Sequence, residues 1–413
     1  MIGRVVTALG GIVGPGGENT RVREAYEHVV EEFFGTGTAF AFWKGRIALY
    51  ALLKALDLGE GDEVILPGYT CVMVPGPVLY AGAKPVYVDI DPEFYNLRPD
   101  EVERKLSPRT RAIVVQHSYG FPAPVERIRE IADAHGISII EDCCHTFGGR
   151  VGGRLLGTFG QAAFFSAQWN KPFSTGLGGL ALVHDPDLAE RVRQQQAGFG
   201  IPSRKAAFML ASQLLACELL VYPSVTMPLT QVFRWLAKKG LAVGSSSKAE
   251  FDIVMPPDYA LRPAPVQCRM GKQEVGRVES NINKRNHAVT HYLAELPALG
   301  YAVPSVPDYW QAMILRFPLR VANKSEALEK ASGYGVEIGS WFECPLHPIE
   351  TDLEAFGYRK GDCPVAEKAA AEVINLPTHR RMSDKDIDKT LGFVEAICRP
   401  TIASAGAGRQ PRL

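Results

Sequence analysis

The sequence predicts an α/β protein with two parts: a large domain built on a mostly parallel sheet, and a smaller α+β domain at the C-terminal end. Short apolar, β-rich runs alternate with helical patterns from about residue 45 to residue 200. Such alternation is typical of a parallel sheet with helices on both faces. A proline-rich joint follows near residue 256, and beyond it the order of elements changes. We therefore place the domain boundary at this joint.

Six apolar runs of four or five residues predict the buried strands of the large domain. They span residues 63–66, 85–88, 112–116, 138–141, 162–166 and 179–183. Helical patterns fall between them at residues 46–56, 99–106 and 124–135, with prolines close to two of the helix starts. Because functional sites in parallel sheets gather at the carboxyl ends of strands, the residues just past these runs are the first candidates for a site.

The C-terminal domain is expected to contain a long helix, one strand and two shorter helices. In order, these elements span residues 266–296, 313–321, 324–332 and 383–398. The predicted domains are residues 1–255 and 256–402. The small, polar end of the chain, residues 403–413, is expected to be disordered.

An apolar segment at residues 206–236 is the least expected part of the large domain. Gln213 and Glu218 interrupt its first stretch and Pro223 ends it, so the stretch is shorter than the roughly 20 residues that a transmembrane helix requires. Two interpretations remain open. The segment forms a helical hairpin buried in a subunit interface or over the active site, or it makes a peripheral membrane contact.

Composition limits the class of partner. Lysine plus arginine equals aspartate plus glutamate at 45 each over 413 residues, so no overall electrostatic field attracts nucleic acid. The eight cysteines match neither a zinc spacing nor a disulfide framework. We therefore expect no metal site. A reducing cytoplasm is the simpler location, or the membrane surface facing it if the apolar segment binds lipid.

Lys171 is the first candidate for chemistry. It lies in an irregular, glycine-rich loop flanked by aromatic residues, where desolvation would lower the pKa of its amine toward a nucleophilic state. A solvated surface lysine is the alternative. Asp142 ends one of the apolar runs. A carboxylate buried there needs a partner such as a pyridinium nitrogen, although an N-cap or a structural salt bridge would also satisfy it.

A phosphate site is predicted from the start of a helix. Gly45 and Arg46 begin a helical pattern, and free amides beside an arginine favour an anion. Ser166 would add a hydroxyl, and His145 could hydrogen-bond a phenolic oxygen. Pyridoxal phosphate (PLP) makes three main demands on a protein: an amine that forms an imine, a carboxylate that holds the pyridinium, and a binding site for the phosphate.

In this order the motifs resemble the DegT/DnrJ/EryC1/StrS sugar aminotransferases, which have the aspartate aminotransferase (type I) fold of PLP-dependent transferases. The resemblance covers most of the chain from about Gly45 to about Ile397, outside the apolar segment. It rests on Gly-Glu-Gly-Asp-Glu-Val-Ile-Leu-Pro, His-Ser-Tyr-Gly-Phe-Pro, Ile-Ile-Glu-Asp, Ser166 with Lys171, Pro-Leu-His and Leu-Pro-Thr-His.

The resemblance implies which residues contact the cofactor and the substrate. The cofactor residues would be Gly45, Arg46, Cys71, Asp142, His145, Ser166 and Lys171. Lys171 is similar to the catalytic lysine that forms the imine. Tyr69, His117 and His347 are candidates for the substrate pocket, with a structural role for the two histidines as the alternative.

Five positions, two of them in the phosphate turn, depart from the family. The phosphate turn is Lys-Gly-Arg where the family commonly has Ser-Gly-Thr, and Cys71 stands where an aromatic residue usually stacks on the ring. His145 replaces a glutamine, and Ala260 replaces an asparagine that the partner subunit usually lends to the phosphate. These departures concern the identity of the substrate more than that of the cofactor.

The resemblance implies an enzyme, namely a PLP-dependent aminotransferase. It would move an amino group from an amino acid, glutamate by analogy, to a keto group of a nucleotide-linked sugar in amino-sugar or surface polysaccharide biosynthesis. A homodimer with the active site at the interface is also implied. The alternatives are a sugar dehydratase, a PLP enzyme for a non-sugar or lipid-linked ketone, and a non-catalytic regulator that retains the fold. Relatives that act as dehydratases carry histidine in place of the lysine, so Lys171 argues against that branch.

Overall fold

The computed structural model describes residues 20–220, 243–244, 246–348 and 351–401, together with Thr7 and Gly10. The tail at residues 403–413, and the apolar segment beyond Leu220, therefore lie outside the described residues.

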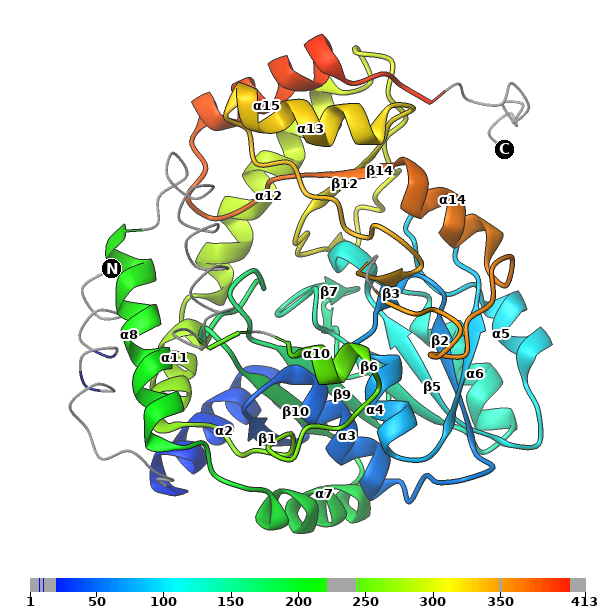
Figure 1. Ribbon diagram of the computed structural model, residues 1–413, viewed down its shortest axis with the longest axis vertical. Helices are drawn as coiled ribbons and strands as arrows, with labels where there is room; N and C mark the ends of the chain where they lie inside the picture. Colours follow the sequence, from blue (N-terminus) through cyan, green and yellow to red (C-terminus); the bar gives the residue numbers. More distant parts are fainter. Residues whose placement is uncertain are drawn as a thin grey trace.

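A seven-stranded sheet forms the centre of the large domain (Figure 1). In spatial order its strands are β1 (Thr38–Phe42), β10 (Gly179–Val183), β9 (Ala162–Ser166), β6 (Ser138–Asp142), β5 (Thr110–Gln116), β2 (Glu63–Pro67) and β4 (Lys84–Val88). Within this sheet β10 is antiparallel to both of its neighbours, and the remaining pairs are parallel. The mostly parallel sheet and its six predicted strands are confirmed, whereas β1 was not predicted.

Helices cover both faces of this sheet. The helices of one face are α3 (Gly45–Ala55), α4 (Pro75–Tyr80) and α7 (Pro186–Gly198), and those of the other are α2 (Thr20–Phe34), α5 (Pro99–Lys105) and α6 (Val125–Ala134). Alternate strand residues contribute to two separate hydrophobic cores: Val64 and Leu66 belong to one, and Ile65 belongs to the other. Burial of both faces explains why the strands are continuous apolar runs in the sequence.

The C-terminal region has α+β character, as predicted. Its elements are α12 (Val278–Glu295), β12 (Phe317–Arg320), α13 (Lys324–Tyr334), α14 (Pro364–Glu372), β14 (Val373–Leu376) and α15 (Asp384–Ile397). β12 and β14 pair antiparallel, and α13 and α15 lie side by side at the end of the molecule farthest from the large sheet (Figure 1).

Two boundaries of this region differ from the expectation. The long helical stretch expected over residues 266–296 is helical but interrupted, because the chain forms α11 (Pro265–Val275) and α12 with a break at Gly276 and Arg277. α11 packs on α2 whereas α12 packs on α15, so the two helices pack against different parts of the fold. The strand expected over residues 313–321 is confined to β12.

Short elements complete the fold around the sheet edge. They are β3 (Thr70–Cys71) paired with β13 (Leu346–His347), β11 (Trp310–Gln311) paired with β7 (Arg150–Val151), β8 (Arg154–Leu155), a 3-10 turn at Ser118–Gly120, and α10 (Lys248–Phe251). The β3–β13 pair is parallel and joins the loop after β2 to the C-terminal region. It therefore brings two distant parts of the chain to the same end of the sheet.

α8 (Arg204–Leu220) is the described part of the apolar segment, and it is helical as expected. Leu210 is buried, whereas the side chain of Phe208 is 52% exposed. Glu218 is buried and pairs with Arg381 at 3.4 Å, which explains the acidic interruption in an apolar run. Among the helices that the structure describes, none is both long enough and apolar enough to cross a bilayer.

Candidate active site

The residues predicted to contact the cofactor meet at one cavity. Gly45, Arg46, Cys71, Asp142, His145, Ser166 and Lys171 all line it. They come from the start of α3, from β3, from the carboxyl ends of β6 and β9, and from the loops that follow these two strands. The topology of the parallel sheet therefore brings together residues that are far apart in the sequence.

Lys171 lies in the irregular loop between β9 and β10, as the sequence predicted. Its Nζ is 4.9 Å from the centroid of the Trp341 ring. Burial lowers the pKa of the amine, Cys144 and Asp142 act in the opposite direction, and Arg316 lowers it further. A lowered pKa favours the neutral amine, which is the form that attacks a carbonyl.

Asp142 places a carboxylate in the same cavity. Its Oδ1 accepts a hydrogen bond of 2.8 Å from the backbone N–H of Cys144. Burial raises the pKa of this carboxyl, against the opposing effects of Cys144 and Lys171. A carboxylate offers about four acceptor positions, so Asp142 retains capacity for a cationic partner in the cavity.

The start of α3 also lines the cavity, and free amides at a helix start suit an anion. Its N-cap residue, Lys44, makes no side-chain hydrogen bond to the helix, so the first amides lack a side-chain acceptor. A β-carbon on Gly45 would lie 3.0 Å from Cβ of Ser166 and 3.1 Å from the carbonyl oxygen of Phe165. Glycine therefore lets the helix start approach β9, where the Ser166 hydroxyl is available.

Two cations stand beside this helix start. Arg46 forms a buried salt bridge of 2.5 Å with Glu250 of α10. Lys44, which was not among the predicted site residues, also lines the cavity. Burial and the nearby Arg46 lower the pKa of Lys44 to about 8. The lysine and arginine that replace the family's hydroxyl residues are thus both in place for an anion.

His145 is held in one orientation. Its Nδ1 accepts a hydrogen bond of 3.1 Å from the backbone N–H of Tyr119, so the neutral ring carries its proton on Nε2. Burial holds the pKa of His145 well below its ordinary value. Its ring stacks on Trp341 with centroids 5.6 Å apart. His145 is therefore a neutral donor at the cavity wall.

Tyr69 and His347, two of the three substrate candidates, lie behind the cavity lining. Tyr69 is fully buried, and its hydroxyl is 2.8 Å from the hydroxyl of Tyr119. His347 is the β13 partner of Cys71, and its Nδ1 lies 3.7 Å from a carboxylate oxygen of Glu343. Both residues support the wall on which Cys71 stands.

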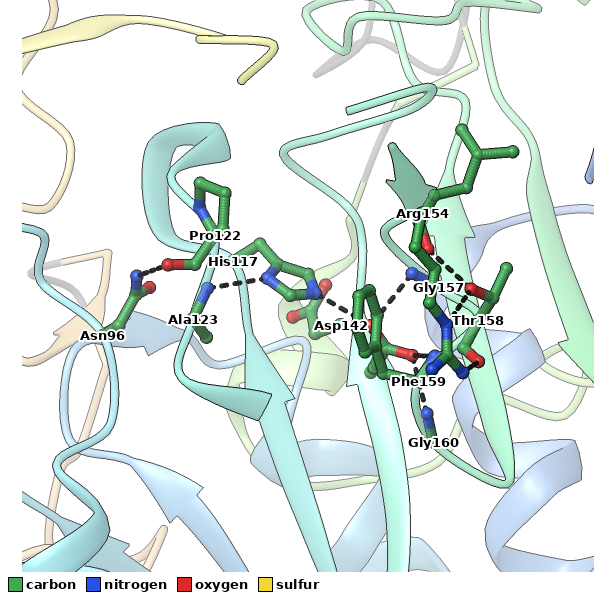
Figure 2. Close-up of polar contacts among 12 residues, drawn as sticks. Asn96, His117, Pro122, Ala123, Asp142, Arg154, Gly157, Thr158, Phe159 and Gly160 are labelled. Carbon is green, nitrogen blue, oxygen red and sulfur yellow. Dashed lines mark hydrogen bonds and ion pairs between the residues drawn. The ribbon is translucent and has the colours of Figure 1, made fainter. Parts of the chain in front are cut away.

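His117, the third candidate, belongs to a buried polar network instead. Its Nδ1 accepts a hydrogen bond of 3.0 Å from the backbone N–H of Ala123, so its Nε2 donates to Glu141 at 3.1 Å. Figure 2 shows His117 between Ala123 on one side and the loop with Gly157 and Phe159 on the other. The geometry favours the structural role over the substrate pocket.

The carboxylate at the centre of this network is saturated. Besides His117, Glu141 accepts hydrogen bonds from the backbone N–H groups of Gly157, Phe159 and Gly160 at 2.9, 2.6 and 2.8 Å. Cys143 approaches within 4.8 Å, and these residue types could hold a metal ion. Because the carboxylate oxygens and both ring nitrogens already make hydrogen bonds to the chain, the cluster is organised as a structural support.

Sequence reasoning missed several residues of the cavity wall, including Gln116, Cys144 and Phe342. Gln116 carried a detectable signal, since it is a polar residue at the end of an apolar strand. Its side chain accepts a hydrogen bond of 2.6 Å from the Thr70 hydroxyl. Phe342 carried none, because only the folding of the C-terminal region onto the sheet edge brings it to the cavity.

Comparison with known proteins gives consistent results. The model of the DegT/DnrJ/EryC1/StrS aminotransferase family matches residues 16–217 and 227–395. GDP-perosamine synthase of Caulobacter vibrioides is 26% identical over 379 residues, which cover 90% of this chain and 89% of that protein. L-glutamine:2-deoxy-scyllo-inosose aminotransferase of Streptomyces kanamyceticus is 44% identical over 153 residues, or 37% of this chain and 36% of that protein.

A solved structure agrees with the fold. The aminotransferase TlmJ from Streptoalloteichus hindustanus superposes with a TM-score of 0.75 at 25% identity, over 95% of each chain. The fold class expected from the sequence, and the family resemblance with it, are therefore confirmed.

Proposed function

This chain belongs to the DegT/DnrJ/EryC1/StrS aminotransferase family and is an aminotransferase. We propose that it uses PLP to aminate the keto group of a nucleotide-linked sugar. The proposed amino donor is an α-amino acid, glutamate first. One observation carries the proposal: the Lys171 amine, the Asp142 carboxylate and the uncapped start of α3 line the same cavity. The likeness to a GDP-perosamine synthase supports a sugar acceptor.

The residues present fit PLP. The helix start with Lys44, Gly45 and Arg46 would take the phosphate. Asp142 has acceptor capacity left for a pyridinium nitrogen, and its cost of burial falls when it gains that partner. Lys171 supplies the amine that an aldehyde requires. When bound, PLP supplies an electron sink for the negative charge that develops at the substrate α-carbon.

The chain's own residues then have separate tasks. Lys171 would hold the cofactor and later carry a proton between the substrate α-carbon and the cofactor's C4′ carbon, because its lowered pKa makes the amine an effective base. Asp142 would keep the pyridine nitrogen protonated. His145 would donate from Nε2 to an oxygen in the cavity. The apolar lining residues Phe164, Leu177 and Phe342 would exclude water.

The assembly and location are also proposals. We propose a cytoplasmic homodimer whose active site lies at the subunit interface, with residues 1–255 and 256–402 as its two domains. Phe208 and Leu219 of α8 are 52% and 48% exposed, which supports contact of the apolar segment with a second copy of the chain. A membrane contact would show instead as binding to anionic lipid vesicles.

The test is the visible absorption spectrum of the purified, PLP-loaded protein. Glutamate is expected to convert the band of the lysine-bound cofactor to that of its amine form, with release of 2-oxoglutarate. A nucleotide-linked ketosugar should then restore the first band. Lys171→Ala is expected to lose both changes, and borohydride reduction should label Lys171 alone. A wild-type spectrum that no amino acid changes would contradict the proposal.

A non-nucleotide cyclic ketone is the second candidate acceptor. The specific support is the 44% identity, over 153 residues, to an aminotransferase named for 2-deoxy-scyllo-inosose. Offering the aminated enzyme either this ketone or a nucleotide-linked ketosugar distinguishes the two, because only the true acceptor restores the first band.

A further inference from the structure

A second cavity adjoins the first, and Lys171 lines both. Its wall carries an unusual number of charges. The charged or titratable residues besides Lys171 are Glu218, Glu274, Arg285, Arg316, Glu337, His379, Arg380 and Arg381. The roles proposed above use none of these side chains, so this cavity is open to a separate interpretation.

Most of the cations in this cavity have partners within the protein. Arg380 lies 3.4 Å from a carboxylate oxygen of Glu274, and Arg381 lies 3.4 Å from one of Glu218. Arg285 donates to the carbonyl oxygen of Leu315 at 3.2 Å. These contacts account for the positions of three of the four arginines.

Arg316 is different. Its guanidinium carbon lies 5.0 Å from the centroid of the Trp341 ring, and it makes no hydrogen bond or ion pair with any residue that the structure describes. Burial lowers the pKa of this guanidinium, while Glu337 raises it through space. Arg316 is half-buried, and a guanidinium that is partly withdrawn from water without a bound anion is unfavourable. An anion from solution would therefore be favourable here.

The position of Arg316 relative to Lys171 indicates which anion. Lys171 Nζ and the Arg316 guanidinium contact the same Trp341 ring at 4.9 and 5.0 Å. In an α-amino acid the carboxylate is bonded to the very carbon whose amino group must react beside Lys171. The diphosphate of a nucleotide-linked sugar is separated from the reacting keto carbon by the sugar ring. Because Arg316 lies close to Lys171, the carboxylate of an amino acid fits this position better than the diphosphate of a nucleotide-linked sugar.

We propose that Arg316 binds the α-carboxylate of the amino donor, an assignment that rests on the proposed aminotransferase function. The planar guanidinium would grip the carboxylate with two parallel hydrogen bonds. The contact with the Trp341 ring would help to hold the guanidinium in place before the donor arrives. Arg316 is then a specificity residue for α-amino acids as a class, and it takes no part in binding the acceptor.

Arg316→Gln tests this assignment in the PLP-loaded protein. The rate constant for amination of the cofactor at low donor concentration is expected to fall about 100-fold, and by a similar factor for glutamate, glutamine and alanine, since all three carry an α-carboxylate. Affinity for 2-oxoglutarate, measured by calorimetry, should fall to a similar extent. Arg316→Lys is expected to lose less, because it keeps the charge but not the two-pronged geometry.

The matched control is Arg320→Gln, at the end of β12, the strand that begins directly after Arg316. Its guanidinium lies 3.5 Å from Glu372 and donates to the carbonyl oxygen of Pro92 at 3.0 Å, so both donor reaction and 2-oxoglutarate affinity should stay within about threefold of wild type. An unchanged cofactor band in each variant shows that it is folded and loaded. Reaction of the aminated Arg316→Gln enzyme with the acceptor should also stay within about threefold.

Each contrary outcome is distinct. If Arg316→Gln reacts with donors as the wild type does, the assignment is overturned while the proposed function stands. A loss confined to glutamate would place Arg316 at the side-chain carboxylate, and a loss in the acceptor reaction would place it at a phosphate. Both results overturn the assignment. If no amino acid converts the wild-type cofactor, the proposed function fails first and takes the assignment with it.

Discussion

Glu141 and Asp142 are consecutive carboxylates at the end of one strand, yet the structure uses them in opposite ways. Side chains alternate between the faces of a strand, so Glu141 points into a closed network and Asp142 into the cavity. Glu141 accepts hydrogen bonds from three backbone amides and from His117. The carboxylate of Asp142 accepts its hydrogen bonds from Cys144 alone among the described residues.

The pKa values of the two carboxyl groups shift in opposite directions. Burial raises the pKa of both, but for Glu141 the hydrogen bonds from His117 and the backbone outweigh burial and the pKa is lowered. For Asp142 burial prevails and the pKa is raised. A buried carboxylate with all of its partners inside the protein supports the fold, whereas one with unfilled acceptor capacity facing a cavity is prepared for a ligand.

The largest expected effect comes from the open carboxylate. Asp142→Asn should lower the rate of amino transfer about 1,000-fold, because the amide cannot hold a pyridinium proton. Single-turnover absorbance with glutamate measures this rate. Glu141→Gln is the matched control and should lose less than tenfold, since its side chain does not line the cavity. Equal losses in the two variants would break the comparison.

The order is reversed for stability: Glu141→Gln should lower the free energy of unfolding, whereas Asp142→Asn should not. Removing the charge of Glu141 leaves three backbone amides and His117 facing a neutral amide, so Glu141→Gln should lower the free energy of unfolding by about 3 kcal/mol. Urea denaturation of the cofactor-free protein measures it. The loss should shrink as the pH falls below the ordinary glutamic acid value of about 4.3, because the wild type also loses this stabilisation as its carboxylate is protonated.

Asp142→Asn should leave the cofactor-free protein at least as stable as the wild type at neutral pH. A raised pKa in the folded state means that the ionised carboxylate destabilises the fold at pH values above the ordinary aspartic acid value of about 3.9. A large loss of stability in this variant would show that Asp142 has structural partners of its own.

A smaller effect is expected at the phosphate seat. Arg46→Gln should weaken PLP binding about 30-fold, since it removes a charged hydrogen-bond donor beside the helix start. Equilibrium dialysis of PLP measures this affinity. Arg98→Gln is a control, because Arg98 pairs with Asp100 on the surface. An unchanged affinity in Arg46→Gln would show that the salt bridge with Glu250 keeps Arg46 from the phosphate.

The smallest effect is a pH dependence from Lys44. Because the pKa of Lys44 is about 8, its charge is present below that pH and lost above it. PLP affinity should therefore fall several-fold between about pH 7 and pH 9. Lys44→Met should have a weaker but flatter affinity over that range. A wild-type profile without this slope would contradict a role for the lysine charge in the phosphate seat.

Much of the fold was predictable because each local pattern agreed with the tertiary structure. The strands buried on both faces are continuous apolar runs. Asp142 and Ser166 stand at the ends of such runs, and Lys171 lies in the loop that follows one of them. The errors have local causes. β1 lies between two helices and outside the strict alternation, and the break at Gly276 was hidden within a helical pattern.

The sequence by itself determined the class of fold, the family and the predicted cofactor residues that meet at the cavity, because periodicity and motif order are properties of the chain. Only the tertiary structure decided which of two neighbouring carboxylates is saturated, that His117 supports the fold, and that Arg316 has no partner among the described residues. Hydrogen-bond saturation depends on groups brought from distant segments, and no local pattern records their arrival.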